Sequence, residues 1–254
     1  MGSRMKNLNW CCFVLLIPLN ALADTASIGS GFDYSSGKYG GSTTTDILYI
    51  PLTGKYEWDD LTLKLTLPYI RQTSTNDVVR GIGRIRKPTV QKVTTTEAGL
   101  GDVTASADYT IYDGDSLTLD VYEGIKFGTA SSSKGLGTGE NDYSTELDGD
   151  YTINQSSIYW SAGYTVVGVP AGYQFRNVSY GSIGASQRID DNTTIGLTYD
   201  ASESASTLSE NPSELTFDVS MKLDKETKVT TDISKGLSSG SPDFGFGLMV
   251  KNSF

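Results

Sequence analysis

The sequence predicts an all-β protein, an up-and-down antiparallel transmembrane β-barrel of about twelve strands with both termini in the periplasm. Three observations carry this prediction. The chain ends on an alternating strand with a terminal phenylalanine, and it begins with an export signal. Between these ends, segments of alternating apolar and polar residues are joined by connections that are alternately short and long.

The carboxyl-terminal segment has a strand pattern. Successive side chains of a strand point to opposite faces, so one face here is apolar while the other carries Gly, Met, Lys and Ser. Lipid outside and a lumen inside suit these two faces; a half-buried edge strand closing a soluble sandwich is the alternative. The terminal aromatic resembles the signal that barrel-assembly machinery reads, which makes Phe254 a candidate assembly signal and that machinery an expected partner. The apolar face comprises Phe244, Phe246, Leu248, Val250 and Phe254.

The amino-terminal segment has the features of a secretory signal peptide. Arg4 and Lys6 precede an apolar stretch from Trp10 to Leu19, and Ala21-Leu22-Ala23 supplies the small-x-small cleavage site. We therefore expect residues 1–23 to be a removed signal peptide and residues 24–254 to form a single outer-membrane barrel domain of a Gram-negative bacterium.

Composition excludes several classes of function. The chain has no histidine, and its two cysteines, Cys11 and Cys12, lie in the predicted signal peptide. This removes Ser-His and Cys-His nucleophilic pairs and the usual zinc sites, so we expect no enzyme activity, no catalytic residues, no cofactor and no bound metal. The net charge of −10 argues against nucleic acid as a partner, and loss of Arg4 and Lys6 makes the mature chain more acidic still.

The connections between the predicted strands alternate in length, which is the arrangement of short periplasmic turns and long external loops. The mean hydropathy of −0.24 does not oppose this prediction, because barrel strands turn only half of their residues to lipid. The short turns are 59–60, 113–115, 154–156, 190–192 and 224–226, and the long segments are 35–43, 73–99, 129–140, 168–173, 202–211 and 236–242.

Twelve segments have the alternation of strands, and most reach the roughly 9 to 11 residues that a tilted strand needs to cross the bilayer. In chain order they are 25–34, 44–58, 61–72, 100–112, 116–128, 141–153, 157–167, 174–189, 193–201, 212–223, 227–235 and 243–254.

The period of two also assigns the faces. In the segment 61–72, the odd-numbered positions from Leu61 to Tyr69 are apolar and are predicted to face lipid, and aromatic residues near the strand ends predict two interfacial girdles. Glu123 breaks the pattern, because it shares a face with Val121 and Ile125. Either a β-bulge after Val121 shifts the register, or the wall has a side opening at Glu123 through which a solute leaves toward the membrane.

Several segments resemble a bacterial outer-membrane family named for phenol meta-pathway degradation, whose members are often called transporters. The resemblance covers nearly all of the mature chain. It implies a barrel of this size and a role in the passage of small molecules, and it implies no specific ligand. The segments that carry it are Thr45-Asp-Ile-Leu-Tyr-Ile-Pro-Leu52, Leu65-Thr-Leu-Pro-Tyr-Ile70, Gly99-Leu-Gly-Asp-Val103, Lys134-Gly-Leu-Gly-Thr-Gly139 with Asp142-Tyr-Ser144, and Ser241-Pro-Asp-Phe-Gly-Phe-Gly247.

The predicted inward positions carry an excess of carboxylates, which would concentrate cations in a low-dielectric lumen. Alternatively, these charges pair across the wall and fill a narrow barrel. The sequence does not decide between a conducting lumen and a plugged one. The carboxylates at 146, 148 and 150 stand on one strand face, where a solvated stripe is favoured over a cation site. The lumen-lining candidates are Glu57, Lys64, Asp102, Asp108, Asp120, Lys126, Glu146, Asp148, Asp150, Asp200, Asp218, Lys222 and Asp232.

The long segment 73–99 is basic although the chain as a whole is acidic. It could fold inward and constrict the lumen, bind the phosphates of surface lipopolysaccharide, or stay solvated. Its basic residues are Arg80, Arg84, Arg86, Lys87 and Lys92.

Together these features predict an outer-membrane channel for small molecules, among them aromatic and other small organic compounds, with a lumen that favours cationic or neutral solutes. The expected partners are membrane lipid, lipopolysaccharide, the assembly machinery and a small solute; the oligomeric state is left open. The alternative is a non-conducting surface barrel with a structural or adhesive role.

Overall fold

The computed structural model describes residues 25–75, 78–80, 83–84 and 93–254, and the predicted signal peptide lies outside them. The described chain is all-β. Its strands are β1 (Thr25–Gly37), β2 (Thr45–Trp58), β3 (Leu61–Ser74), β4 (Val78–Val79), β5 (Gly83–Arg84), β6 (Thr95–Leu100), β7 (Val103–Asp113), β8 (Leu117–Phe127), β9 (Asp142–Ile153), β10 (Ser156–Val166), β11 (Val178–Arg188), β12 (Thr193–Ser202), β13 (Ser213–Lys222), β14 (Thr227–Gly236) and β15 (Phe244–Ser253). Among these residues, no helix is long and apolar enough to cross a membrane.

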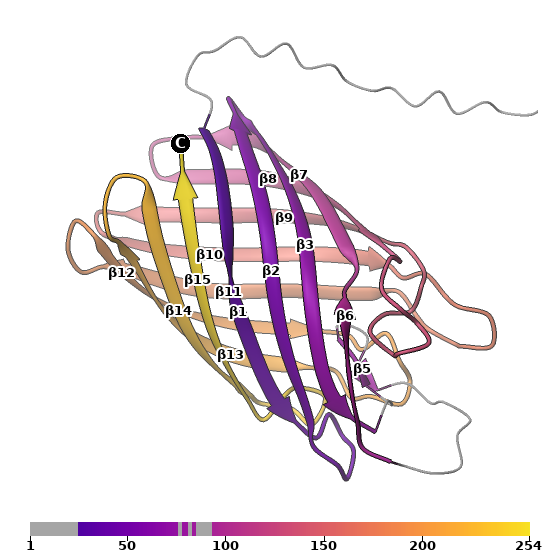
Figure 1. The fold of residues 1–254 in the computed structure, drawn as a ribbon. Coiled ribbons are helices and arrows are strands. Elements are labelled where there is room, and N and C mark those ends of the chain that lie inside the picture. The colour runs from indigo at the N-terminus through magenta and orange to yellow at the C-terminus, as the bar shows by residue number, and fades with distance from the viewer. Residues whose placement is uncertain (1–24, 76–77, 81–82, 85–92) are drawn as a thin grey trace, which may run out of the picture.

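The strands close into an antiparallel barrel, as predicted (Figure 1). Each wall strand pairs with its neighbour in the chain, and β1 completes the ring by pairing with β15 from Ser27↔Ser253 to Ser36↔Phe244. The consecutive segments β6 and β7 both pair with β3 and form one wall strand, so the wall has the predicted twelve strands.

The wall strand formed by β6 and β7 is interrupted opposite a proline. Pro68 of β3 has no N–H to donate, and its carbonyl instead accepts a hydrogen bond of 2.8 Å from the N–H of Gly101. The interruption falls between Tyr69↔Leu100 and Thr66↔Thr104. Asp102, at the break, is thereby freed from the regular ladder and can bind loop residues.

The two ends of the barrel differ in their connections. Short turns lie at the end that carries both termini, and the long connections gather at the other end (Figure 1). Asp59 and Asn154, in the tight turns after β2 and β9, have φ values of 45° and 56°, the left-handed conformation that favours Asn and Asp in such hairpins. The predicted topology with periplasmic termini is therefore confirmed.

The alternation of exposed and buried side chains confirms the predicted facing of β3. Leu65 and Leu67 are 47% and 45% exposed on the outer surface, whereas Thr66 and Ile70 are 7% and 4% exposed inside the barrel. The outer surface carries many other exposed apolar and aromatic side chains. Water would disfavour such a surface and lipid accommodates it, which fits the architecture of Gram-negative outer-membrane barrels.

Three local predictions are corrected. The bulge expected in β8 after Val121 lies instead in β7, between Thr110 and Tyr112. Pairing of β8 with both neighbours is regular through Glu123, which remains on the outer face and accepts a 2.8 Å hydrogen bond from the Thr145 hydroxyl. The wall is hydrogen-bonded on both sides there, which leaves no side opening.

The other two corrections concern strand limits. The segment 73–99 is not wholly a loop, because β3 continues to Ser74 and β6 starts at Thr95. The predicted strand 174–189 starts late, at Val178, because Tyr173 and Phe175 pack against the interior cluster around Val79 rather than joining the wall.

Candidate functional site

The lumen holds the candidate site, and residues 78–80 of the basic segment lie inside the barrel at the end with the long loops. Gln72, an inward residue of β3 that is 3% exposed, donates a 2.8 Å hydrogen bond from Nε2 to the carbonyl of Val78. The same nitrogen lies 3.0 Å from the Ser74 hydroxyl. This buried amide holds the start of the segment inside the barrel.

Two adjacent valines bind the segment to different parts of the wall. Val78 packs in a buried cluster with Ile47 of β2 and Ile70 of β3. Val79 packs in a second cluster with Val167 and Ala205, which follow β10 and β12. Both valines are 3% exposed. Because β2 and β3 are separated from β10 and β12 in the wall, this short segment crosses the mouth of the barrel.

Arg80 fixes the segment by its charge. Its Nη1 lies 2.9 Å from Asp33 Oδ1 on β1, and its Cζ lies 3.9 Å from the ring centroid of Tyr49 on β2. An ion pair and a cation–π contact on one guanidinium restrict its orientation more than either would alone. Of the three interpretations of the basic segment, inward folding is the one that residues 78–80 adopt.

A cavity of about 280 Å³ lies beside Arg80 at the mouth. Three carboxylates in its lining belong to loops or strand ends on the β12–β13 side: Glu203, Glu210 and Glu214. Glu203 accepts a 2.9 Å hydrogen bond from the N–H of Ser179, which lowers the pKa of its carboxyl. The mouth thus combines the Arg80 guanidinium, held by Asp33 and Tyr49, with three carboxylates on the β12–β13 side of the cavity.

A larger cavity of about 690 Å³ occupies the half of the lumen nearer the termini. This volume is within the range of small-molecule sites. Most of the side chains that line it are charged or carry a hydroxyl group. The predicted lumen candidates in its lining are Lys64, Asp108, Asp120, Glu146 and Asp148, and Lys55, Lys251 and Tyr122 complete the set of ionisable side chains.

Inward glycines make room for tyrosine rings on the inner wall of the barrel. A Cβ added to Gly163 would lie 2.3 Å from the Tyr180 ring, and one added to Gly124 would lie 2.3 Å from the Tyr122 hydroxyl oxygen. Each tyrosine therefore occupies the space that a side chain on its neighbouring glycine would need. These two rings therefore lie against the inner wall.

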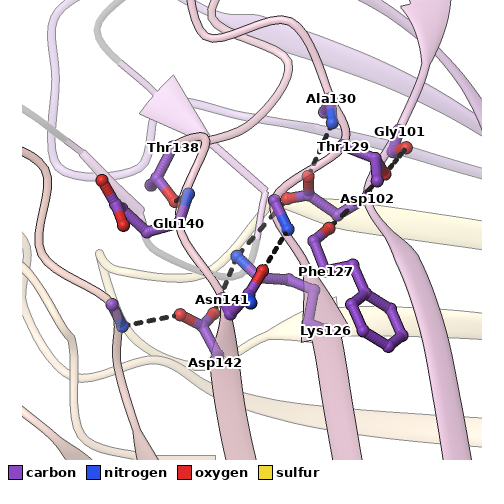
Figure 2. Close-up of polar contacts among 12 residues, drawn as sticks. Gly101, Asp102, Lys126, Phe127, Thr129, Ala130, Thr138, Glu140, Asn141 and Asp142 are labelled. Carbon is purple, nitrogen blue, oxygen red and sulfur yellow. Dashed lines mark hydrogen bonds and ion pairs between the residues drawn. The ribbon is translucent and has the colours of Figure 1, made fainter. Parts of the chain in front are cut away.

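Two of the predicted lumen residues, Asp102 and Lys126, belong to an ion-pair cluster at the extracellular rim (Figure 2). Lys126 Nζ lies 3.3 Å from Asp102 Oδ2 and 2.8 Å from Asp142 Oδ2. The other carboxylate oxygens accept 2.8 and 2.9 Å hydrogen bonds from the N–H groups of Ala130 and Gly168. This cluster attaches the loops after β8 and β10 to the wall.

The other predicted lumen residues lie elsewhere on the inner wall. Asp200 lines a third cavity of about 490 Å³ together with Glu146. Asp218 and Asp232 are cross-strand partners, and Lys222 is the partner of Lys228. The remaining two lie near the periplasmic end: Glu57 pairs with Lys55 at 2.7 Å, and Asp150 accepts a 2.7 Å hydrogen bond from the Thr152 hydroxyl.

Sequence reasoning missed several residues of the lumen, among them Lys228, Asp33, Tyr49 and Tyr122. Lys228 was detectable, because it precedes the outward Val229 and so belongs to the inward row of β14. Asp33 and Tyr49 were also on inward rows, but their contact with Arg80 depends on a segment 47 residues from Asp33. No local pattern encodes such a pairing.

Several predicted residues remain without a structural test. Arg86, Lys87 and Lys92 lie outside the described residues, and Arg84 is described only as part of β5. The Phe254 side chain is 74% exposed beyond the end of β15, while its backbone exchanges hydrogen bonds of 2.9 and 3.2 Å with Ala26. Within the described part of the chain, no group of three or more His, Cys, Asp or Glu side chains has an arrangement that could hold a metal ion.

Solved structures with the same fold include outer-membrane channels. An outer membrane channel from Pseudomonas putida F1 aligns with a TM-score of 0.64 at 12% identity, covering 91% of this chain and 95% of that one. The KdgM porin aligns with a TM-score of 0.55 at 12% identity over 90% and 99% of the two chains, and the NanC porin with 0.51 at 12% over 90% and 98%. No protein-family model matches the sequence, and the search of curated proteins finds no match.

Proposed function

We propose that this protein is an outer-membrane channel for small molecules whose mouth is narrowed by residues 78–80. The observation that carries the proposal is a lumen cavity of about 690 Å³ that is lined mainly by charged and hydroxyl side chains rather than by interdigitated apolar ones. A barrel that served only as a surface scaffold would gain more stability from an apolar or fully ion-paired interior.

Structural likeness supports a channel without identifying its solute. The similar structures include porins, one of which was solved in a complex with disordered oligogalacturonate. That acidic ligand belongs to the porin in question. Here the inward rows of the described strands carry more carboxylates than lysines, so we propose a channel that favours cations and neutral solutes and disfavours acidic sugars. The phenol meta-pathway resemblance is consistent with small organic solutes.

The test is the reversal potential of the mature protein in planar bilayers under a KCl gradient. We expect discrete conductance steps and a reversal potential on the cation-selective side. The Glu146→Gln, Asp148→Asn, Asp150→Asn variant should shift the reversal potential toward zero, because it removes three inward carboxylates of β9.

A matched control is Asp115→Asn, Asp191→Asn, Glu226→Gln, which neutralises three carboxylates in periplasmic turns. This control should keep most of the wild-type selectivity, since turn charges lie in water at the barrel end and are screened. A complete absence of conductance from correctly folded protein would favour the non-conducting surface barrel instead.

A further inference from the structure

The charges of the large lumen cavity are separated into a basic side and an acidic side. The basic side comes from inward lysines near the periplasmic end of the barrel. Lys55, Lys64 and Lys251 line the cavity. Lys55 is the cross-strand partner of Lys64, and Lys251 is the partner of Lys228, which in turn pairs with Lys222 outside the cavity lining. Strand β1 lies between Lys251 on β15 and Lys55 on β2, and it contributes only the uncharged residues Ser27 and Gly29 to the cavity lining.

This lysine arrangement is unfavourable by itself. Like charges directly opposite each other on neighbouring strands repel. Among the described residues, Lys55 is neutralised by Glu57 at 2.7 Å, whereas Lys64, Lys228 and Lys251 form no ion pair. The wall therefore holds several lumen-facing ammonium groups close together. Their carboxylate neighbours, Asp108 for Lys64 and Asp218 for Lys228, lie beyond ion-pair distance.

The acidic side lies on the next three wall strands. Asp108 of β7, Asp120 of β8 and the β9 residues Glu146 and Asp148 line the same cavity. Asp120 and Asp148 are direct cross-strand partners, so they too are a like-charge pair. None of these four carboxylates forms an ion pair with a described residue.

The two sets are on the same cavity but on different strands. Lys251, Lys55 and Lys64 approach it from β15, β2 and β3, and the four carboxylates approach it from β7 to β9. Charges that only fill a lumen are expected to form close ion pairs, as Lys126 and Asp102 do at the rim. The described charges of this cavity form no such pairs with one another. The cavity instead has a positive wall and a negative wall, and the two meet where Asp108 of β7 lies near Lys64 of β3.

We propose that this cavity takes small zwitterions, which carry an anionic group and an ammonium group a few carbon atoms apart. The anionic group would meet the lysines while the ammonium group meets the carboxylates, so both like-charge arrays are offset by one molecule. A simple cation or anion offsets only one array. This inference rests on the proposed channel function and names the class of solute that the channel favours.

The experiment is osmotic swelling of liposomes that contain the full mature barrel. The probe is 4-aminobutanoate, and the comparison solute is its uncharged isostere 4-hydroxybutanamide. We expect the zwitterion to enter several-fold faster than the isostere through the wild-type barrel. Two double variants test the two walls. We expect the rate ratio to fall close to one both in the lysine variant (Lys64→Met with Lys251→Met) and in the carboxylate variant (Asp120→Asn with Asp148→Asn).

Matched controls change the same number of charges away from the cavity. Two double variants of exposed loop and turn residues should leave the ratio unchanged: Lys38→Met with Lys225→Met, and Asp115→Asn with Asp191→Asn. The folded state of every variant is checked by the shift in gel mobility on boiling, so that a misfolded variant is not scored.

The outcomes separate this inference from the channel proposal. If neither solute enters through the folded wild-type barrel, the proposed channel function is overturned. If the uncharged isostere enters and the wild-type ratio is one or lower, the barrel is a channel but the zwitterion site is overturned. The same holds if the ratio exceeds one but survives both pairs of cavity substitutions.

Discussion

At the scale of single residues, the lumen is shaped by small side chains that make room for large ones. Gly163 on β10 faces inward, and the Tyr180 ring of β11 lies where its Cβ would be. A glycine costs conformational entropy in a strand, so its presence here indicates a packing requirement. The requirement is that a tyrosine lies along the wall instead of across the lumen.

We predict that Gly163→Ala lowers conductance. The new methyl group would force the Tyr180 ring away from the wall and into the lumen, since a separation of 2.3 Å is too short for two carbon atoms. The measurement is single-channel conductance of folded protein. Gly54→Ala is the control, because a Cβ at this outward glycine has no atom within 4 Å. Equal conductance of wild type and Gly163→Ala would contradict this packing argument.

At the scale of elements, the barrel relies on turns that are closed by side-chain carboxylates. Asp190 and Asp224 each accept hydrogen bonds of 2.7 to 2.8 Å from the backbone N–H groups two and three residues ahead. These backbone hydrogen bonds lower the pKa of both carboxyls. The folded barrel therefore favours the ionised forms in both turns.

We predict a pH-dependent loss of stability in Asp190→Ala, Asp224→Ala. Because the folded pKa is depressed, the stabilisation is fully present above the ordinary carboxyl pKa of 3.8 and fades as pH falls through the lower folded value. Thermal unfolding, followed by the gel-mobility shift, should separate variant from wild type at neutral pH and less so in strong acid. A separation that is the same at both pH values would contradict the assigned role of ionisation.

Some strand positions are encoded by local sequence, and others depend on contacts between distant parts of the chain. Strand positions such as β2 and β9 follow from alternation and from turn residues, both of which are local properties of the chain. The bulge in β7 and the late start of β11 are not local. The late start of β11 depends on how Tyr173 and Phe175 pack inside the mouth, which becomes defined only when the barrel closes. The bulge lies beside the short turn after β7, and no residue pattern around it distinguishes it from a regular strand.

At the scale of the whole molecule, the barrel has a constricted mouth above a charged cavity. The wall, its twelve strands and its lipid-facing surface could be predicted because the period of two applies to every strand. The inward position of Val78, Val79 and Arg80 could not, since it requires contacts with strands on both sides of the barrel. The candidate cavity was predicted in part. The inward charges were identified, but not their arrangement with lysines on one side of the cavity and carboxylates on the other.

We propose that the lumen conducts and that residues 78–80 limit its conductance. The most direct measurement is single-channel conductance of wild type beside Val78→Ser, Val79→Ser, Arg80→Gln, with Val93→Ser, an exposed residue of the same connection, as control. We predict conductance steps in all three proteins, larger in the triple variant because its segment loses both apolar clusters and the Asp33 ion pair. Equal conductance in all three, or no conductance from any folded protein, would contradict the claim.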